Sequence, residues 1–138
     1  MISKNIRFGM VQGRLTAPPG NELQWFPQES WQHEFKLASE LGIDYIELIA
    51  EVKHNPNNPI WSDDGIDKIK QLVEINKLTL HALCNDYIVE HKLLDDSVVE
   101  QNIELIQQAK KLSIEKYIMP LFELSELKVN NMDTFIEP

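Results

Sequence analysis

Cysteine is almost absent from this sequence. Cys84 is the only one, so no disulfide can form within the chain, and a reducing, cytoplasmic setting is expected. Positive charge is also scarce: 13 Lys and Arg stand against 22 Asp and Glu, which gives a formal net charge of −9. Nucleic acids and anionic membranes both favour a cationic protein surface, so this balance argues against either partner. Apolar runs are short, and none approaches the ~20 residues of a membrane-spanning helix.

The rest of the composition is that of an ordinary globular protein. Hydrophobic residues make up 43% of the 138 residues and charged residues 25%, which provides enough apolar material for one domain with a core. No low-complexity stretch or linker interrupts the chain, so residues 1–138 are predicted to form a single domain. The opening residues run straight into an apolar strand pattern, from which we expect no signal peptide.

The clearest structural pattern lies in residues 30–51, where an amphipathic helix precedes an apolar strand. The helix is predicted over Pro27–Leu41, with an apolar face formed by Trp31, Phe35, Ala38 and Leu41. Gly42 follows, where a left-handed C-terminal cap is expected. Ile43–Ala50 is then almost continuously apolar, as in a strand covered on both faces. Glu47 is the exception, and its carboxylate must either be desolvated or face a polar pocket.

The same alternation of strand and helix continues along the chain. Ser62 is predicted to cap a second helix, Ser97 and Glu100 have capping-box spacing for a third that runs to about Leu112, and residues 132–138 resemble the start of a fourth. The other strands are predicted at Ile6–Gly13, Leu78–Cys84 and Lys116–Phe122. The apolar faces of the second and third helices are predicted at Ile66, Ile69, Leu72, Val73 and at Val99, Ile103, Ile106, Ala109. This order predicts an α/β fold with a parallel sheet.

Two of the predicted connections are long. One covers Arg14–Pro27 and the other residues 52–61, and long loops in compact domains tend to be functional. Trp25 and Trp61 lie in these loops and are predicted to wall the mouth of a pocket, whereas Trp31 is predicted to be a core residue.

Three stretches carry a family resemblance: GMVQGRL at 9–15, SWQHEFKLASELGIDYIEL at 30–48, and LCNDY at 83–87. Together they resemble the sugar phosphate isomerase/epimerase family, which has the xylose-isomerase-like TIM barrel fold. The resemblance covers nearly the whole chain. An eight-stranded barrel needs ~250 residues, so it implies that this chain supplies about four βα units, half of a barrel.

The resemblance also has implications for chemistry. In the family, a divalent metal (Mn, Mg or Zn) is bound by Glu, Asp and His residues of strands five to eight, and two of those carboxylates transfer the proton. The chain would then carry neither metal ligands nor catalytic residues of its own, and a metal cofactor is expected only for a full-length member. The isolated half is expected to be inactive.

The substrate-binding candidates lie at the carboxyl ends of the predicted strands, where barrels of this type place their sites. Arg14 could clamp a substrate phosphate, or it could be an exposed loop arginine. Gln12 could bond a sugar hydroxyl. Glu47 shares one strand face with Tyr45 and Ile49, so it either lines the barrel lumen or is a structural acid bonded to a neighbouring strand.

Further candidates follow the third strand. Asn85, Asp86 and Tyr87 could shape a sugar pocket or form an Asx-type turn, and the family often has Ala where this chain has Asn85. His81 could polarise a carbonyl, but a lone strand histidine is more often a hydrogen-bonded core residue. Cys84 is interpreted as a small buried hydrophobe.

Three functional hypotheses remain open. The first is a sugar or sugar-phosphate isomerase or epimerase, in which a base removes a proton beside a carbonyl with metal assistance. The alternative is a non-catalytic half-barrel that acts as a binding or assembly module, and in either case open strand edges predict a homodimer or larger homo-oligomer. A DNA-repair endonuclease of the same barrel superfamily is disfavoured by the acidic balance.

Overall fold

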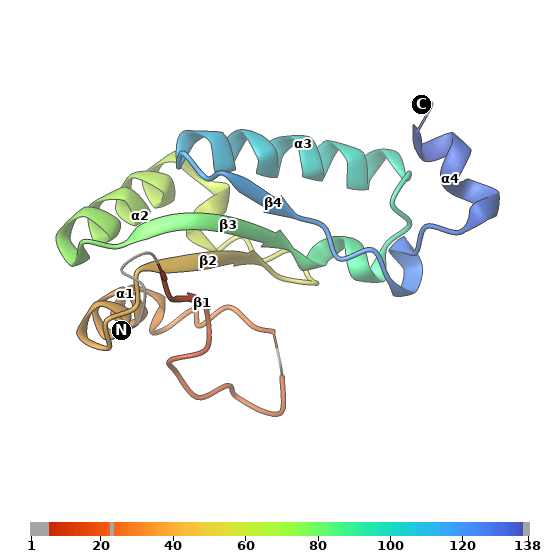
Figure 1. Cartoon of the computed structure of the whole chain (residues 1–138). Helices are drawn as coiled ribbons and strands as arrows, with labels where there is room; N and C mark the ends of the chain where they lie inside the picture. The colour runs from red at the N-terminus through yellow and green to blue at the C-terminus, as the bar shows by residue number, and fades with distance from the viewer. Residues whose placement is uncertain (1–5, 23, 137–138) are drawn as a thin grey trace.

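A four-stranded parallel sheet, in the order β1-β2-β3-β4, organises the chain (Figure 1). The computed structural model describes residues 6–22 and 24–136. Its strands are β1 (Gly9–Val11), β2 (Tyr45–Ala50), β3 (Thr79–Asn85) and β4 (Lys116–Ile118). Its helices are α1 (Trp31–Glu40), α2 (Asp63–Asn76), α3 (Asp96–Lys111) and α4 (Val129–Ile136), with short 3₁₀ turns η1 (Pro59–Trp61), η2 (Asp86–Glu90) and η3 (Glu123–Ser125). The predicted α/β fold with a parallel sheet is confirmed, and the strands lie in sequence order.

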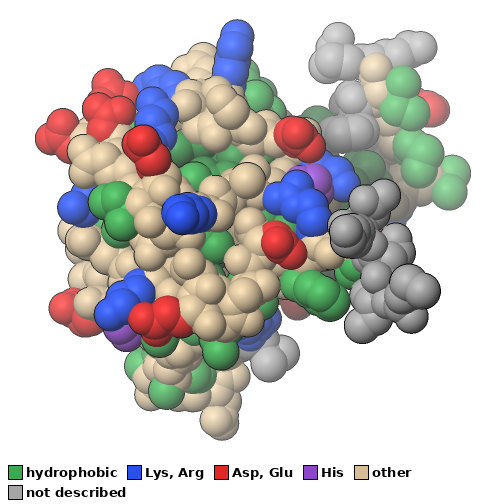
Figure 2. All heavy atoms as spheres, turned by 60° about the vertical axis from the view of Figure 1, so that its left-hand side comes forward, with side chains coloured by type: hydrophobic (Ala, Val, Ile, Leu, Met, Phe, Trp, Pro, Cys, Tyr) green, Lys and Arg blue, Asp and Glu red, His purple; other side chains and the backbone are tan. Residues whose placement is uncertain are grey.

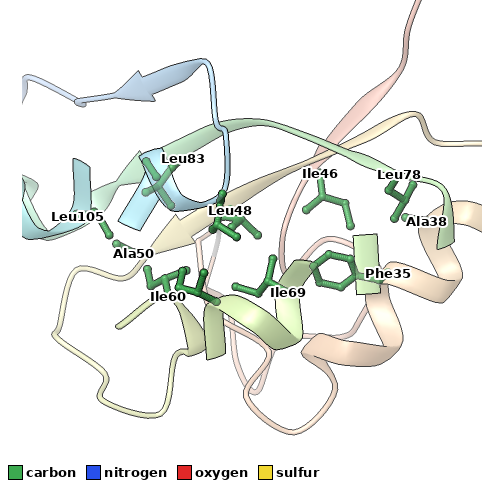
Figure 3. Packing of buried hydrophobic residues seen from close by; sticks show 13 residues of the cluster. Phe35, Ala38, Ile46, Leu48, Ala50, Ile60, Ile69, Leu78, Leu83 and Leu105 are labelled. Atoms are coloured by element: carbon green, nitrogen blue, oxygen red, sulfur yellow. The ribbon is translucent and has the colours of Figure 1, made fainter. Parts of the chain in front are cut away.

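The core lies between one face of the sheet and helices α1, α2 and α3. Ile46, Leu48 and Ala50 alternate along β2 and point toward these helices, as period-two geometry requires (Figure 3). They meet the fully buried side chains of Phe35, Ile69 and Leu105. Burying this apolar surface supplies most of the stability, at roughly 25 cal/mol per Å².

The opposite face of β2 carries Tyr45, Glu47 and Ile49, as the sequence predicts. Parallel pairing joins Val11 to Glu47 and Glu47 to Ala82, and the register between β2 and β3 shifts between Ile46 and Glu47. Glu47 is only half-buried, whereas Ile49 is fully buried. The register shift therefore coincides with the one acidic position of the strand.

Three strands are shorter than predicted, and β2 lacks only the first two residues of the predicted Ile43–Ala50. β1 covers Gly9–Val11 of the predicted Ile6–Gly13, and β4 covers Lys116–Ile118 of the predicted Lys116–Phe122. Gly13 has φ +86°, a left-handed conformation that turns the chain out of the ladder. Beyond β4, Pro120 has no N–H to donate, so it cannot extend the pairing.

Helix α1 begins later than predicted, at Trp31 rather than Pro27. Residues 27–30 form a turn, in which the Ser30 amide donates to Pro27 O at 2.9 Å. Leu41, predicted on the buried face, lies past the end of the helix and is exposed. Gly42 has φ +74°, which confirms the predicted left-handed cap, and the Ile43 amide then donates to Ala38 O at 2.9 Å.

The predicted apolar face of α3 is wrong by one position. Val99, Ile103 and Ile106 are exposed, at 40%, 52% and 49%. Of the predicted stripe, only Ala109 is buried, and the face against the sheet is formed by Val98, Asn102, Leu105, Gln108 and Ala109. The helix begins at Asp96 after Asp95, so the predicted capping box at Ser97 and Glu100 lies inside its first turns.

Helix α2 follows the prediction closely. Ser62 accepts a hydrogen bond from the Gly65 amide at 3.1 Å, and Ile66 and Ile69 are buried. Lys77 ends the helix in a left-handed conformation, with φ 55°.

Helix α4 begins three residues before the predicted start at residue 132, and residues 137–138 of that prediction lie outside the described part. It stands apart from the layered body, beyond the end of the sheet to which the strand arrows point (Figure 1). None of the helices in residues 6–22 and 24–136 is long and apolar enough to cross a membrane.

Candidate functional site

Two acidic side chains, Glu47 of β2 and Asp86 after β3, lie near enough to each other for the charge of Asp86 to act on Glu47. Gln12 directly follows β1, and its backbone N–H donates to the backbone carbonyl of Glu47 at 2.9 Å. The register pairs Val11 with Glu47, so side-chain alternation places the Gln12 side chain on the opposite face of the sheet from the Glu47 side chain.

Gln12 is 2% exposed and Asp86 is 5% exposed, yet Gln12 Oε1 and Asp86 Oδ2 have no hydrogen-bond partner among the described residues. Buried polar atoms are normally paired, and four further side-chain atoms of the described residues, in Trp61, Asn85, Gln101 and Gln108, also lack a partner. We call Glu47 and Asp86 the acceptor cluster.

The charge of Asp86 influences the protonation of Glu47. Burial raises the pKa of Glu47, and the charge of Asp86 raises it further. Burial also raises the pKa of Asp86, although a hydrogen bond from Cys84 and the charge of Arg14 act in the opposite direction. The Cys84 thiol donates to Asp86 Oδ1 at 3.2 Å.

Cys84 is buried, as the sequence predicts, and its pKa is strongly raised, first by burial and then by Asp86. It is therefore a neutral hydrogen-bond donor and not a reactive thiolate.

Arg14 lies at the boundary of the acceptor cluster. Its side chain is exposed, and Nη2 donates to Gln24 Oε1 at 3.3 Å. Its charge reaches Asp86, whose pKa it lowers. Arg14, in the loop that follows β1, thus bonds to Gln24 of the same loop and acts on Asp86 through its charge.

A cleft of about 620 Å³ opens between the two long loops, and neither acid of the acceptor cluster lines it. Gln24, the hydrogen-bond partner of Arg14, is one of its walls. Trp25 also lines it, as predicted, whereas Trp61 does not and instead packs against His54 with ring centroids 4.9 Å apart. The full lining is Pro19, Glu22, Gln24, Trp25, Phe26, Glu51, Val52, Lys53, His54, Asn55, Pro56 and Glu90.

Glu34 holds the loop after β1 in place. This residue of α1 is fully buried and accepts hydrogen bonds from the Gly13 amide at 2.7 Å, the Leu15 amide at 3.1 Å and Thr16 Oγ1 at 2.9 Å. Trp25 Nε1 donates to Gly13 O at 2.9 Å, which fixes its ring at the cleft. The sequence analysis missed Glu34. Its signal was an acid at helical spacing from Trp31 and Ala38, on the face that packs inward.

Asparagines hold the second long loop. Asn58, 1% exposed, donates to Ile49 O at 2.9 Å and to Glu51 Oε2 at 2.7 Å. Asn55 donates to the other oxygen of Glu51 at 2.8 Å. Both carboxylate oxygens of Glu51, which lines the cleft, therefore have hydrogen-bond partners.

Asn85, a predicted substrate contact, faces α3 instead. Its amide nitrogen lies 3.0 Å from Gln101 Oε1, Asn102 Oδ1 and the Tyr117 hydroxyl. These contacts tie β3 to α3 and β4 on the helix side of the sheet. The structure therefore does not bring Asn85 together with the acceptor cluster.

Tyr87 and His81 also lie elsewhere. Tyr87 stacks on His91 at 3.9 Å between ring centroids and packs against the small apolar cluster of Ile88, Leu93 and Val98. His81 lies toward the amino end of β3, with Nδ1 3.7 Å from Glu115 Oε2. These positions favour structural roles for both residues.

The arrangement presents acceptors and few donors. Across residues 6–22 and 24–136, no group of three or more His, Cys, Asp and Glu side chains could hold a metal ion. Figure 2 shows acidic and basic side chains intermingled among the described residues of one face, without a cationic stripe. Chemically, the acceptor cluster suits a ligand that donates hydrogen bonds. No protein-family model matches the chain, and no curated protein matches it.

Proposed function

We propose that the chain binds a small polyhydroxylated molecule, a sugar or sugar phosphate, at the acceptor cluster. One observation carries this proposal: Asp86 Oδ2 is buried without a partner among the described residues, and Asp86 lies close enough to the half-buried Glu47 for its charge to raise the pKa of Glu47. A buried polar atom without a partner costs about 1–3 kcal/mol. A ligand hydroxyl that donates to Asp86 Oδ2 would remove that cost.

The fold supports an isomerase- or epimerase-like assignment. Four parallel strands in sequential order match the first half of a (β/α)₈ barrel, in which chemistry occurs at the carboxyl ends of the strands. In a complete sugar phosphate isomerase/epimerase, the metal and the proton-transferring carboxylates belong to the second half. We therefore propose that this chain binds substrate but shows no isomerase turnover alone.

Calorimetric titration with pentoses, hexoses and their phosphates tests this proposal. We expect millimolar or tighter binding of at least one sugar, weakened about tenfold or more by Asp86→Ala, which removes a buried hydrogen-bond acceptor. Glu104→Gln, on the exposed side of α3, is the matched control and should bind as wild type does. Absence of binding at 20 mM sugar (on the order of the weakest measurable affinity) would rule the proposal out.

Chelator-sensitive turnover of a ketose phosphate by the isolated chain would contradict the second part of the proposal. It would show that a metal can be bound and used without the second half of a barrel. The expected result is no turnover with or without added Mn²⁺, Mg²⁺ or Zn²⁺.

Exposed apolar edges favour a second candidate, an assembly module. Phe8 beside β1 is 60% exposed, and Ile118 and Phe122 on the β4 side are 37% and 51% exposed. No further strand pairs with the outer edge of β1 or β4 within the described part of the chain. Such edges favour pairing with another chain. A second copy could satisfy both edges at once, with β4 of each copy beside β1 of the other.

A further inference from the structure

The two open edges of the sheet carry opposite charges at their ends. Arg7 and Arg14, the only arginines of the sequence, stand before and after β1. Glu115 directly precedes β4, and Glu123 follows β4 at the start of η3. All four residues are exposed, and the Glu115 side chain is 76% exposed. The β1 edge is therefore basic at both ends, and the β4 edge is acidic at both ends.

Contacts within the chain hold two of these charges at the amino end of the sheet. Arg7 donates to Thr79 Oγ1, and its Cζ lies 5.5 Å from the centroid of the Tyr45 ring. A guanidinium has five N–H donors, so this one bond leaves others for a neighbouring chain. Glu115 Oε2 lies 3.7 Å from His81 Nδ1. Both side chains are thus placed where an adjoining strand would meet them.

Parallel pairing of β1 with β4 of another copy would continue both faces of the sheet. Met10 of β1 and Tyr117 of β4 both pack against the core on the helix side. Val11 pairs with Glu47 on the opposite face, and Ile118 lies on that same face of β4. When the two three-residue strands pair over their whole length, Met10 lies opposite Tyr117 and Val11 opposite Ile118. Apolar side chains then meet on both faces of the seam.

Pairing of like edges has no such match. Two β1 edges would bring four arginines together, and two β4 edges would bring four glutamates together, and like charges opposite each other destabilise a sheet. Lys116 within β4 is the one positive group of the acidic edge. A two-fold axis along the strands instead places β4 beside β1 of the other copy at both seams. It also covers the face opposite α1, α2 and α3, and parallel sheets are almost always covered on both faces.

We infer that the partner of the open edges is a second copy of this chain, and that β4 of each copy pairs in parallel with β1 of the other. The arginines beside β1 then face the glutamates beside β4 across each seam. The inference rests on the assembly module proposed above and specifies which edges pair and what selects them. Two such seams close a ring of eight strands, four from each copy.

Single introduced cysteines identify which edges meet, because the native Cys84 is buried. Val11→Cys protein and Ile118→Cys protein are mixed in equal amounts under mild oxidation. We expect a covalent dimer with one copy of each, since a disulfide needs Cα atoms within about 7 Å and these positions face each other across the seam. Either variant alone should form no covalent dimer. Substantial linking within one variant would show that like edges meet and would overturn the inference.

A second mixture tests the direction of the strands. Antiparallel pairing of the same two strands would place Val11 opposite Lys116, so Val11→Cys with Lys116→Cys should give much less disulfide than Val11→Cys with Ile118→Cys. Equal yields would overturn the parallel arrangement. A chain that carries both Val11→Cys and Ile118→Cys should stop at a covalent dimer, because both seams lie within one ring. A ladder of longer products would overturn ring closure.

Charge reversal tests what selects the edges. Arg7→Glu and Glu115→Arg should each raise the dissociation constant of the dimer at least about tenfold in low salt, because each places like charges at both seams. The chain that carries both changes should recover wild-type dimerisation to within about threefold. Lys68→Glu, at an exposed position of α2, changes the net charge as Arg7→Glu does and is the matched control. Failure of the folded double variant to recover would overturn the charge pairing. The cysteine variants leave these charges in place, so their result stands even if Arg7→Glu does not fold.

The outcomes separate the inference from the assembly module. A dimer in sedimentation whose cysteines link like edges, or do not link Val11→Cys to Ile118→Cys, would refute the edge pairing and leave an assembly module in place. A monomer at all concentrations would refute both.

Discussion

At the scale of single residues, burial of the two acids of the acceptor cluster destabilises the folded protein when both are ionised. Burial raises the pKa of Glu47 and of Asp86, so the folded state holds their protons more tightly than the unfolded chain does. Stability must therefore fall as pH rises through the unfolded pKa values toward the folded ones, and the cost stays fully present above them. At neutral pH these carboxylates oppose folding.

Glu47→Gln should accordingly stabilise the protein at pH 7 by up to about 1 kcal/mol, a modest figure because the half-buried side chain is partly screened by water. Below about pH 4, where both states are protonated, the advantage should vanish. Thermal melts of wild type and variant from pH 3 to 8 measure this. A lower melting temperature for Glu47→Gln at pH 7 would instead identify Glu47 as a structural hydrogen-bonded acid.

Glu34 has the opposite role, because its buried carboxylate accepts three hydrogen bonds from the loop after β1. Glu34→Ala should cost about 2–4 kcal/mol of unfolding free energy and should speed amide exchange at Gly13 and Leu15. Chemical denaturation and hydrogen exchange are the measurements. Glu40→Gln, an exposed acid paired with Lys36 on the same helix, is the control and should cost less than about 0.5 kcal/mol.

At the scale of elements, α3 has two apolar faces that are offset by one residue, and only one of them is buried. Leu105 is fully buried, whereas Ile103 is 52% exposed. Leu105→Ala should therefore cost about 2–5 kcal/mol, and Ile103→Ala should stay within about 0.5 kcal/mol of wild type. Urea denaturation of the two variants distinguishes the faces. Equal losses would mean that the Val99, Ile103 and Ile106 face is also covered, in this chain or by another.

The start of α2 depends on close packing against η1. A Cβ at Gly65 would lie 2.1 Å from Pro59 O and 2.6 Å from Pro59 Cα, and neither backbone atom can move freely. Gly65→Ala should lower stability by about 1–3 kcal/mol despite the better helix propensity of alanine. Lys68→Ala, an exposed change on the same helix, is the control. If Gly65→Ala is more stable than wild type, then η1 can move away from the added methyl group at little cost.

At the scale of the whole molecule, the outer edges of β1 and β4, which pair with no further strand in the described part of the chain, lead us to predict self-association. We expect sedimentation at low micromolar concentration to show a concentration-dependent dimer, because the apolar edges gain most from each other. Phe122→Asp should shift the equilibrium toward monomer. Ile75→Asp, at a 75% exposed position on α2 away from either edge, should not. A compact monomer at all concentrations would exclude the assembly module.

Local chemistry was sufficient to predict much of the architecture. The βα alternation, the left-handed Gly42, the Ser62 cap and the Glu47 face all depend on residues near each other in sequence, whose periodicity and backbone preferences are visible without a fold. The sequence also placed Gln12 and Asp86 at the carboxyl ends of two strands, and parallel topology puts those ends on the same side of the sheet. Predicting these features required no knowledge of which distant residues come into contact.

Only the tertiary structure decided which apolar face of α3 packs on the sheet and which distant groups pair with the buried polar side chains. Val99, Ile103 and Ile106 form as regular an apolar stripe as the buried one. The face that packs on the sheet instead carries Leu105 and Asn102, and Asn102 Oδ1 accepts hydrogen bonds from Asn85 and Tyr117. Glu34 found its three donors 18 to 21 residues earlier in the chain, and Asn85 found its partners 16 to 32 residues later. Buried polar groups are satisfied by partners that come close only on folding, so no local pattern in the sequence could have predicted these contacts.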